Sequence, residues 1–142
     1  MRLWHKDLIP VLPRHQLLSQ WRECCCIARN ISVNGTPNHL LVNKVLDYPS
    51  NHLLYYGRLV ELEITKRGYQ CSGDNFDKWF RDETGAVPYP YPEYADLFKG
   101  WHNDRYLRQC LLNLEEKFDC GGISPEEWER IKPIYERSFA ND

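Results

Sequence analysis

The segment RHQLLSQWRECCCIARN, Arg14–Asn30, has the residue spacing of an amphipathic helix, and the expectations for the rest of the chain build on it. Its apolar residues recur every three or four positions, which is typical of a helix with one side in a core. The opposite stripe contains His15, Ser19, Arg22, Cys26 and Arg29, with Glu23 at its edge. A polar stripe is typical of a solvated face. Cations beside a carboxylate also suit a site that binds phosphate and transfers protons. The pattern alone leaves both interpretations open.

Helical spacing continues along the chain. It predicts further helices over Asn38–Leu46, Asn51–Arg67, Asn75–Arg81 and Trp101–Phe118, and a last helix from Ser124 to about Phe139. The last helix has a well-defined start, because the Ser124 cap is followed by a proline and, three residues after the cap, by a glutamate. Before the first helix, Pro10 and Pro13 predict an extended segment.

No segment shows the alternating pattern of a β-strand, so we expect an all-α fold. We expect residues 1–142 to form a single compact domain of about four to six helices, with the amino terminus packed between helices.

Composition excludes some classes of function. The chain has 142 residues, with 18 Lys and Arg against 20 Asp and Glu, for a net charge of -2. A binding site for a polyanion is therefore expected to be a local patch, because the whole molecule has no strong positive field. No apolar run approaches the roughly 18–20 residues of a membrane span. Residues 1–12 lack the apolar centre of a signal peptide. We expect a monomer in the cytoplasm that does not bind membranes.

The cysteines do not indicate a metal site. Three of the six, Cys24, Cys25 and Cys26, are consecutive and point about 100° apart on a helix. Neither Cys-x-x-Cys nor His-x-x-x-His spacing occurs, so we expect no metal, no other cofactor, and reduced thiols.

The segment Pro88-Tyr89-Pro90-Tyr91-Pro92, called the Tyr-Pro segment below, is expected to be stiff and extended. Such a segment packs across a surface as a strap, which is the interpretation we favour, or offers its rings as stacking platforms for bases.

The start of the chain adds a candidate nucleophile. If the first residues enter the fold directly, the α-amine of Met1 lies near the helix that carries Arg22 and Glu23. An α-amine is a weaker base than a lysine side chain, so a useful fraction of it is neutral near pH 7. A neutral amine beside a carboxylate can form a Schiff base and has a proton-transfer group at hand.

Several segments resemble a known family. They are Leu8-Ile9, Leu12, Gln16-Leu17-Leu18, Trp21-Arg22-Glu23, His39, Leu59-Val60-Glu61, Lys66-Arg67-Gly68-Tyr69, His102 and Leu114-Glu115-Glu116-Lys117. Together they are similar to the pyrimidine-dimer DNA glycosylases of the phage base-excision type. The opening Met-Arg-Leu-Trp-His also resembles a bacterial branch of this group. The likeness spans most of the chain, and the aromatic-Arg-Glu motif is its most specific part.

The resemblance implies an all-α enzyme that needs no cofactor and acts on double-stranded DNA with a damaged or modified base. It implies that the α-amine of Met1 attacks the sugar and forms an imine, which Glu23 assists together with strand cleavage. Arg22 matches a residue that grips the DNA backbone at the opened site. Arg2 and Lys117 match basic contacts of the family.

The chain departs from the family pattern at three places. Arg2 follows Met1, and an arginine there generally blocks removal of the methionine, so the amine would belong to Met1 itself. Cys26 and Asn113 stand where the family has arginines. Arg29, one turn beyond Cys26, is the cation that we expect to bind DNA in its place, and His15 shares the same stripe.

Two alternatives remain open. The first is a module on the same fold without catalytic activity, which binds nucleic acid or a protein through the face with Arg22 and Arg29 and through the Tyr-Pro segment. The second is a related enzyme that acts on RNA or on a free modified nucleoside.

Overall fold

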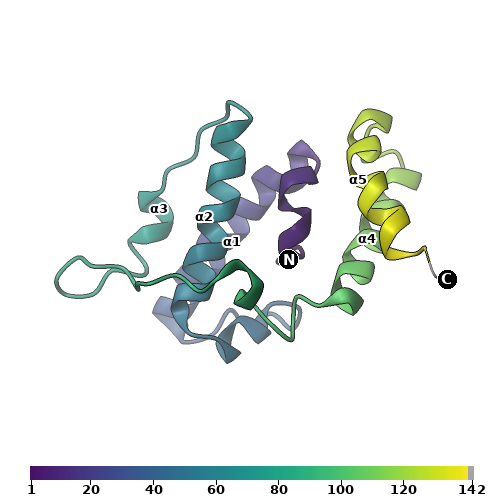
Figure 1. The fold of residues 1–142 in the computed structure, drawn as a ribbon. Helices are drawn as coiled ribbons and strands as arrows, with labels where there is room; N and C mark the ends of the chain where they lie inside the picture. Colours follow the sequence, from purple (N-terminus) through teal and green to yellow (C-terminus); the bar gives the residue numbers. More distant parts are fainter. Residues whose placement is uncertain (141–142) are drawn as a thin grey trace.

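A computed structural model describes residues 1–140 and shows helices joined by turns and extended segments, which confirms the all-α expectation (Figure 1). The four long helices are α1 (Arg14–Asn34), α2 (Ser50–Lys66), α4 (Asp104–Asp119) and α5 (Pro125–Ser138). The short elements are α3 (Asp74–Asp77) and the 3-10 helices η1 (Lys6–Val11), η2 (Asn43–Asp47) and η3 (Tyr94–Asp96).

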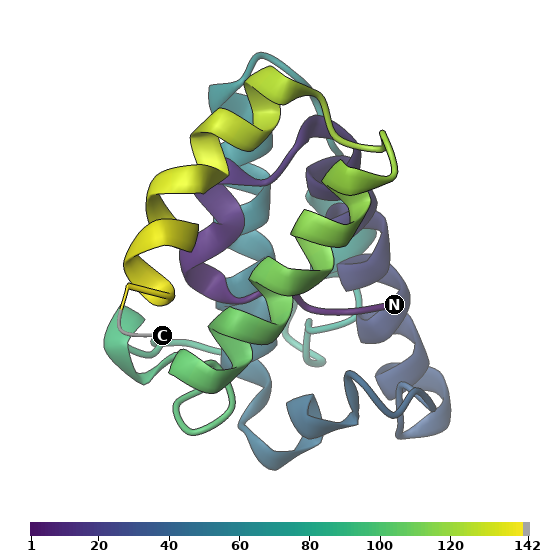
Figure 2. The same cartoon turned by 90° about the vertical axis from the view of Figure 1, so that its right-hand side faces the viewer.

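The helices form two groups with the amino-terminal residues between them. Helices α1 and α2 pack together with α3 beside α1, whereas α4 and α5 form a hairpin (Figure 1). Figure 2 shows this hairpin on the near side, with α1 and α2 behind it. Leu3, Leu8 and Leu12 are fully buried, so the start of the chain is part of the hydrophobic core. The expected packing of the amino terminus between helices is confirmed.

Local sequence signals account for several helix ends. Helix α1 ends at Asn34 because Gly35 adopts a left-handed conformation with φ of 76°, which a glycine tolerates without strain. Ser124 and Glu127 exchange the two hydrogen bonds of a capping box at the start of α5, as expected.

The segment Asn38–Leu46 differs most from the expectation, because it is not an α-helix. Asn38 has a positive φ of 56°, which is incompatible with helix continuation, and only the residues of η2 form a 3-10 turn. The apolar residues that suggested helical periodicity do not share a buried side, since Leu40 is 91% exposed and Leu41 is also exposed.

Three other boundaries also differ. The helix expected over Asn75–Arg81 is only the four residues of α3. Helix α4 begins at Asp104, because the Asn103 side chain accepts the Tyr106 backbone N–H as a cap. The start expected to be extended contains η1, which has Pro10 inside it.

Candidate functional site

The buried side chain of Gln20 holds the first residues of the chain against α1. Its amide nitrogen donates to the Arg2 carbonyl over 2.8 Å and to Glu23 Oε2 over 3.1 Å. Its amide oxygen accepts from the Trp4 backbone N–H over 2.8 Å. The Tyr56 hydroxyl lies 2.9 Å from that oxygen and 2.6 Å from the Trp4 carbonyl oxygen. One side chain of α1 therefore satisfies backbone groups of residues 2 and 4.

This arrangement places Glu23 beside the start of the chain. Its carboxylate oxygen Oε2 accepts from the Arg2 backbone N–H over 3.5 Å, in addition to the bond from Gln20. Glu23 is half-buried, and Met1 is 39% exposed. The structure thus brings Glu23 into contact with Arg2, the residue that follows Met1.

Further bonds hold the same segment on its other sides. The Tyr106 hydroxyl of α4 donates to the Leu3 carbonyl over 2.6 Å. The Lys6 backbone N–H donates to His102 Nδ1 over 3.0 Å. Burial raises the pKa of both Tyr56 and Tyr106, so these hydroxyls stay protonated donors. The amino-terminal segment is therefore fixed by α1, α2 and α4 together.

The side chain of Arg2 is directed toward α4. Its guanidinium lies 5.6 Å from the centre of the Trp4 ring and 5.7 Å from that of Tyr106. Its Nη1 atom lies 3.8 Å from Cys110 Sγ. Cation–π contacts of this kind stabilise a half-buried arginine. They also reduce its freedom to reach a phosphate, which the sequence analysis did not anticipate.

The polar stripe of α1 faces solvent, and a groove runs beside it. Arg22, Cys26, Arg29 and His15 are exposed. The groove between α1 and α3 has a volume of about 460 Å³ and is called the cationic groove below. Its lining consists of Trp21, Arg22, Cys25, Cys26, Arg29, Asn75, Lys78 and Trp79. It collects three cations and two indole rings in a chain whose net charge is -2.

Sequence reasoning missed the contribution of α3 and the residues after it to this groove. The Lys78 ammonium lies 5.0 Å from the centre of the Trp79 ring. The preceding Phe76 is fully buried, with its ring 5.4 Å from that of Trp21. It also packs on Gly57, where a β-carbon would lie only 2.3 Å from the ring. In the sequence, only Gly57 indicated that another element approaches α2 closely, because glycine leaves room for it. The glycine does not indicate which residue approaches.

Two residues expected to bind DNA lie elsewhere. His15 is exposed in the first turn of α1, and Lys117 is exposed in the last turn of α4. Neither lines the cationic groove.

The cysteine side chains are free thiols. Burial raises the pKa of Cys25 to about 11, so its thiol is a poor nucleophile near neutral pH. Among residues 1–140, no three histidine, cysteine or acidic side chains gather in a cluster that could hold a metal ion.

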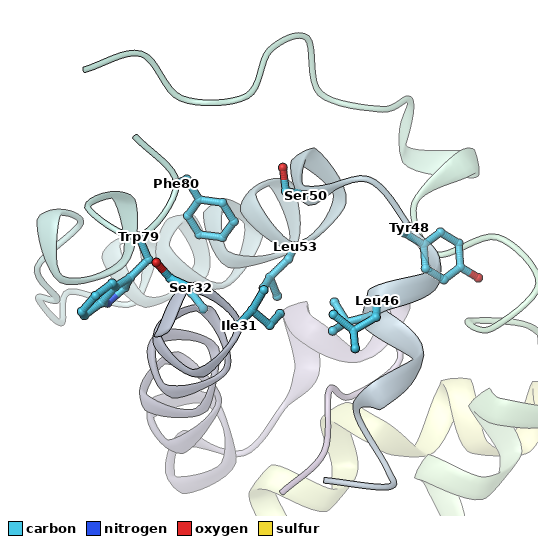
Figure 3. Close-up of a pocket in the computed structure, with 10 residues that line it drawn as sticks. Ile31, Ser32, Leu46, Tyr48, Ser50, Leu53, Trp79 and Phe80 are labelled. Carbon is cyan, nitrogen blue, oxygen red and sulfur yellow. The ribbon is translucent and has the colours of Figure 1, made fainter. Parts of the chain in front are cut away.

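A second hollow of about 220 Å³ lies where the end of α1 meets the start of α2 (Figure 3). Ile31, Leu46 and Leu53 point toward one another in it, and the Phe80 and Trp79 rings lie to one side (Figure 3). Its polar side-chain groups are the hydroxyls of Ser32, Tyr48 and Ser50 and the indole N–H of Trp79, and none of its lining side chains is an acid, a lysine, an arginine or a histidine. Burial raises the pKa of Tyr48, so this hollow offers no group that exchanges protons readily near neutral pH.

The Tyr-Pro segment packs on α2. The Tyr91 ring stacks on Tyr55 with a centre-to-centre distance of 5.3 Å, and Asn51 Nδ2 donates to the Pro90 carbonyl over 2.8 Å. Tyr89 is 86% exposed. The segment therefore lies across the helix as a strap, while one ring remains available to solvent.

A comparison with known families covers the first half of the chain. A family model described as pyrimidine dimer DNA glycosylase matches residues 1–75, which include the amino-terminal segment, α1, α2 and the first residues of α3. This match assigns the chain to the class of DNA glycosylases. The chain is a member of the pyrimidine dimer DNA glycosylase family.

No curated protein and no solved structure matches the chain. Within residues 1–140, none of the helices combines the length and the apolar character needed to cross a bilayer.

Proposed function

We propose that the protein is a DNA glycosylase with an associated lyase activity, in which the α-amine of Met1 is the nucleophile and Glu23 transfers protons. The observation that carries this proposal is the contact between the Glu23 carboxylate and the backbone nitrogen of Arg2. This contact supports the proposal, because a carboxylate beside Arg2 is one residue from the amine and could exchange protons with it. Membership of the glycosylase family supports it as well.

The chemistry has two stages. The amine nitrogen attacks the C1′ carbon of the damaged nucleotide, the glycosidic bond breaks, and the base leaves with the bonding electrons. Loss of a proton from nitrogen and opening of the sugar ring then give an imine. In the second stage a proton is removed from C2′, and the bond from C3′ to its oxygen breaks with release of the phosphate. Glu23 is proposed to accept the proton from nitrogen, to pass it to O4′ of the opening sugar ring, and then to accept the proton from C2′, while the leaving base takes its proton from solvent.

The cationic groove is the proposed binding surface for the DNA backbone. Arg22 and Arg29 are exposed on α1, and Lys78, which follows α3, lines the same groove. These three positive side chains can bind phosphates along one strand. We propose His15, in the first turn of α1, and Lys117, on α4, as additional contacts outside the groove. Access to C1′ in a duplex also requires the enzyme to bend the DNA and to extrude a nucleotide.

Borohydride trapping on a duplex with an abasic site tests this proposal. Reduction of the imine links the protein to DNA, and mass spectrometry of the linked peptide identifies the residue. We expect the adduct on the α-amine of Met1. The matched control is the same protein with an uncleaved extension before Met1, which we expect to give no adduct. An adduct on a lysine, or no adduct from a folded protein with a free amine, would refute the mechanism.

A function in binding alone is a second candidate, and the cationic groove favours it. The groove is lined by residues of α1 and of the region around α3, and none of them belongs to the first five residues. A protein that binds duplex DNA through Arg22, Arg29 and Lys78 but gives no adduct would support this alternative. Competition by single strands, RNA and modified nucleosides in the same assay identifies the substrate class.

A further inference from the structure

The amide of Gln20 is the most completely hydrogen-bonded polar group of the site. Its side chain is fully buried. Both N–H groups donate to oxygens, those of the Arg2 carbonyl and of Glu23 Oε2. The amide oxygen accepts from the Trp4 backbone N–H over 2.8 Å, and the Tyr56 hydroxyl, whose one proton is shared between this oxygen and the Trp4 carbonyl, lies 2.9 Å away. Both N–H groups and the oxygen of the amide therefore have partners.

The surroundings allow only one orientation of this amide. Rotation by 180° about the last side-chain bond would turn the amide oxygen toward the Glu23 carboxylate and the Arg2 carbonyl, where acceptor would meet acceptor. It would also turn the NH2 group toward the Trp4 N–H, where donor would meet donor. Since unsatisfied buried polar groups are costly, Gln20 is fixed in the observed orientation.

We infer that Gln20 is a positioning residue for the reaction, which holds the Glu23 carboxylate in a fixed relation to the amine of Met1. This inference rests on the proposed function. Gln20 reaches the nucleophile through the Arg2 carbonyl and the proton-transfer group through Oε2, so one rigid amide connects the two. Fixing two reacting groups relative to each other is a large source of rate acceleration. Gln20 itself is proposed to contact neither the DNA nor the α-amine nitrogen, and it acts through the Arg2 carbonyl and Glu23.

Two titratable groups interact with Glu23, namely Cys24 beside it on α1 and Tyr56 on α2, and the α-amine of Met1 precedes the Arg2 N–H that Glu23 accepts. Replacing Gln20 by an apolar residue changes none of these charges. A change in the trapping rate of a folded variant would therefore report the lost amide bonds.

Gln20→Met is the principal variant, since methionine has a similar shape and makes none of these bonds. Gln16→Met is the matched control. Gln16 is buried one turn earlier on the same helix, and its amide oxygen has no hydrogen-bond partner within the described residues. The measurements are the rate of borohydride trapping on abasic duplex from pH 5 to pH 9 and hydrogen exchange of the peptide that contains residues 2–6. Thermal unfolding of each variant confirms that it is folded at the assay temperature.

We expect Gln20→Met to trap roughly 10- to 100-fold more slowly than the wild type. The Trp4 amide should exchange faster, because it has lost its acceptor. Gln16→Met should keep the wild-type trapping rate and the wild-type exchange of the Trp4 amide. A variant that is slower only because less of it is folded would regain the wild-type rate once the rate is divided by its folded fraction.

Gln20→Glu gives a second test that does not depend on the behaviour of the methionine variant. A protonated glutamic acid keeps one of the two donors, whereas an ionised one faces Glu23 and the Arg2 carbonyl with acceptors only. Its trapping rate relative to the wild type should therefore rise as the pH falls.

The outcomes separate the two proposals. A wild-type adduct, together with a wild-type trapping rate in Gln20→Met and a rate of Gln20→Glu relative to the wild type that does not change with pH, would refute the positioning role and leave the proposed function standing. The absence of a wild-type adduct would refute the proposed function and the positioning role with it. Hydrogen exchange would then show whether Gln20 only anchors the chain.

Discussion

The two sides of α1 are built in opposite ways. Toward the amino-terminal segment, Gln20 and Glu23 are hydrogen-bonded to backbone groups of Arg2 and Trp4. Toward α3, Arg22 and Arg29 line an open groove and are exposed. We call the side with Gln20 and Glu23 the fixed side, because hydrogen bonds hold these side chains without a ligand. We call the side with Arg22 and Arg29 the open side, because its cations can change conformation when a ligand binds.

The difference explains why the adjacent residues Arg22 and Glu23 have different tasks in the proposed function. Neighbouring residues on a helix point about 100° apart, so one turns to each side. Acid–base chemistry requires a group fixed to within a fraction of an ångström, and Glu23 is on the fixed side. Binding to a phosphate backbone tolerates flexible side chains, and Arg22 is on the open side.

The largest expected effect separates these two tasks. Glu23→Gln should lower the trapping rate on abasic DNA by about 100-fold or more, because it removes the proton-transfer group. Its affinity for the duplex should change little. Arg22→Gln should weaken binding, and its trapping rate at saturating DNA should stay within a few-fold of the wild type. If both variants lost binding and rate in parallel, the division between the two sides of α1 would be wrong.

The buried His102, which binds the amino-terminal segment, should make the free energy of unfolding depend on pH. His102 accepts the Lys6 backbone N–H, and burial lowers its pKa to about 2, from an ordinary value of 6.5. The folded state therefore stays neutral at His102, while the unfolded chain gains a proton below about pH 6.5. By linkage, the free energy of unfolding falls as the pH falls. Between pH 7.5 and pH 5.0 this one group should account for a loss of about 2 kcal/mol.

Urea unfolding at the two pH values measures this loss. His102→Asn keeps an acceptor for Lys6 and should lose about 2 kcal/mol less than the wild type over the same interval. Burial also lowers the pKa of His5 and His52, so part of the pH dependence remains in this variant. Replacement of the exposed His15 by asparagine is the control and should leave the wild-type dependence. An identical pH dependence in His102→Asn and the wild type would show that His102 is protonated without cost in the folded protein.

The comparison also shows how far the sequence predicts this molecule. The amphipathic spacing of α1 placed Arg22 on the exposed stripe and Glu23 at its edge, and both positions are confirmed. The capping box predicted the start of α5 because its bonds join residues only three positions apart. Signals of this kind are local, and local geometry is what a single sequence encodes most directly.

The bonds that fix the site are not local. Gln20 is 16 residues from Trp4 and 36 from Tyr56, and its spacing on α1 says only that it is on the buried side. Likewise, Lys78 joins Arg29 in one groove only because Phe76 packs between Trp21 and Gly57. Over Asn38–Leu46 the sequence predicted a helix, but Leu40 and Leu41 are exposed and only a 3-10 turn forms. Tertiary packing decided the positions of Gln20 and Lys78.

A smaller effect is expected at Gly57 of α2, on which the buried Phe76 of α3 packs. Gly57→Ala would place a β-carbon 2.3 Å from the Phe76 ring, so the ring and α3 have to move. Overpacking typically costs about 1–3 kcal/mol, and the better helix propensity of alanine returns up to about 1 kcal/mol. We expect a net loss of about 1–2 kcal/mol in urea unfolding. In the double variant with Phe76→Leu, the additional cost of alanine should largely disappear. A fully additive double variant would show that Phe76 does not rest on Gly57.

The smallest effect tests the open side itself. Lys78→Gln and Arg29→Gln should each lower the affinity for duplex DNA a few-fold, and each should reduce the slope of log affinity against log salt by about 1, because each removes one phosphate contact. Lys132→Gln on α5 is the control, since it removes the same charge from an exposed lysine outside the groove. If all three variants reduced the slope of log affinity against log salt equally, DNA affinity would depend only on the net charge of the protein. A reduced slope in Lys78→Gln alongside Arg29→Gln would show that the strand spans the groove from α1 to the residues beyond α3. The duplex would then be bound through its phosphate backbone in the groove while Glu23 and the α-amine of Met1 react with the damaged nucleotide.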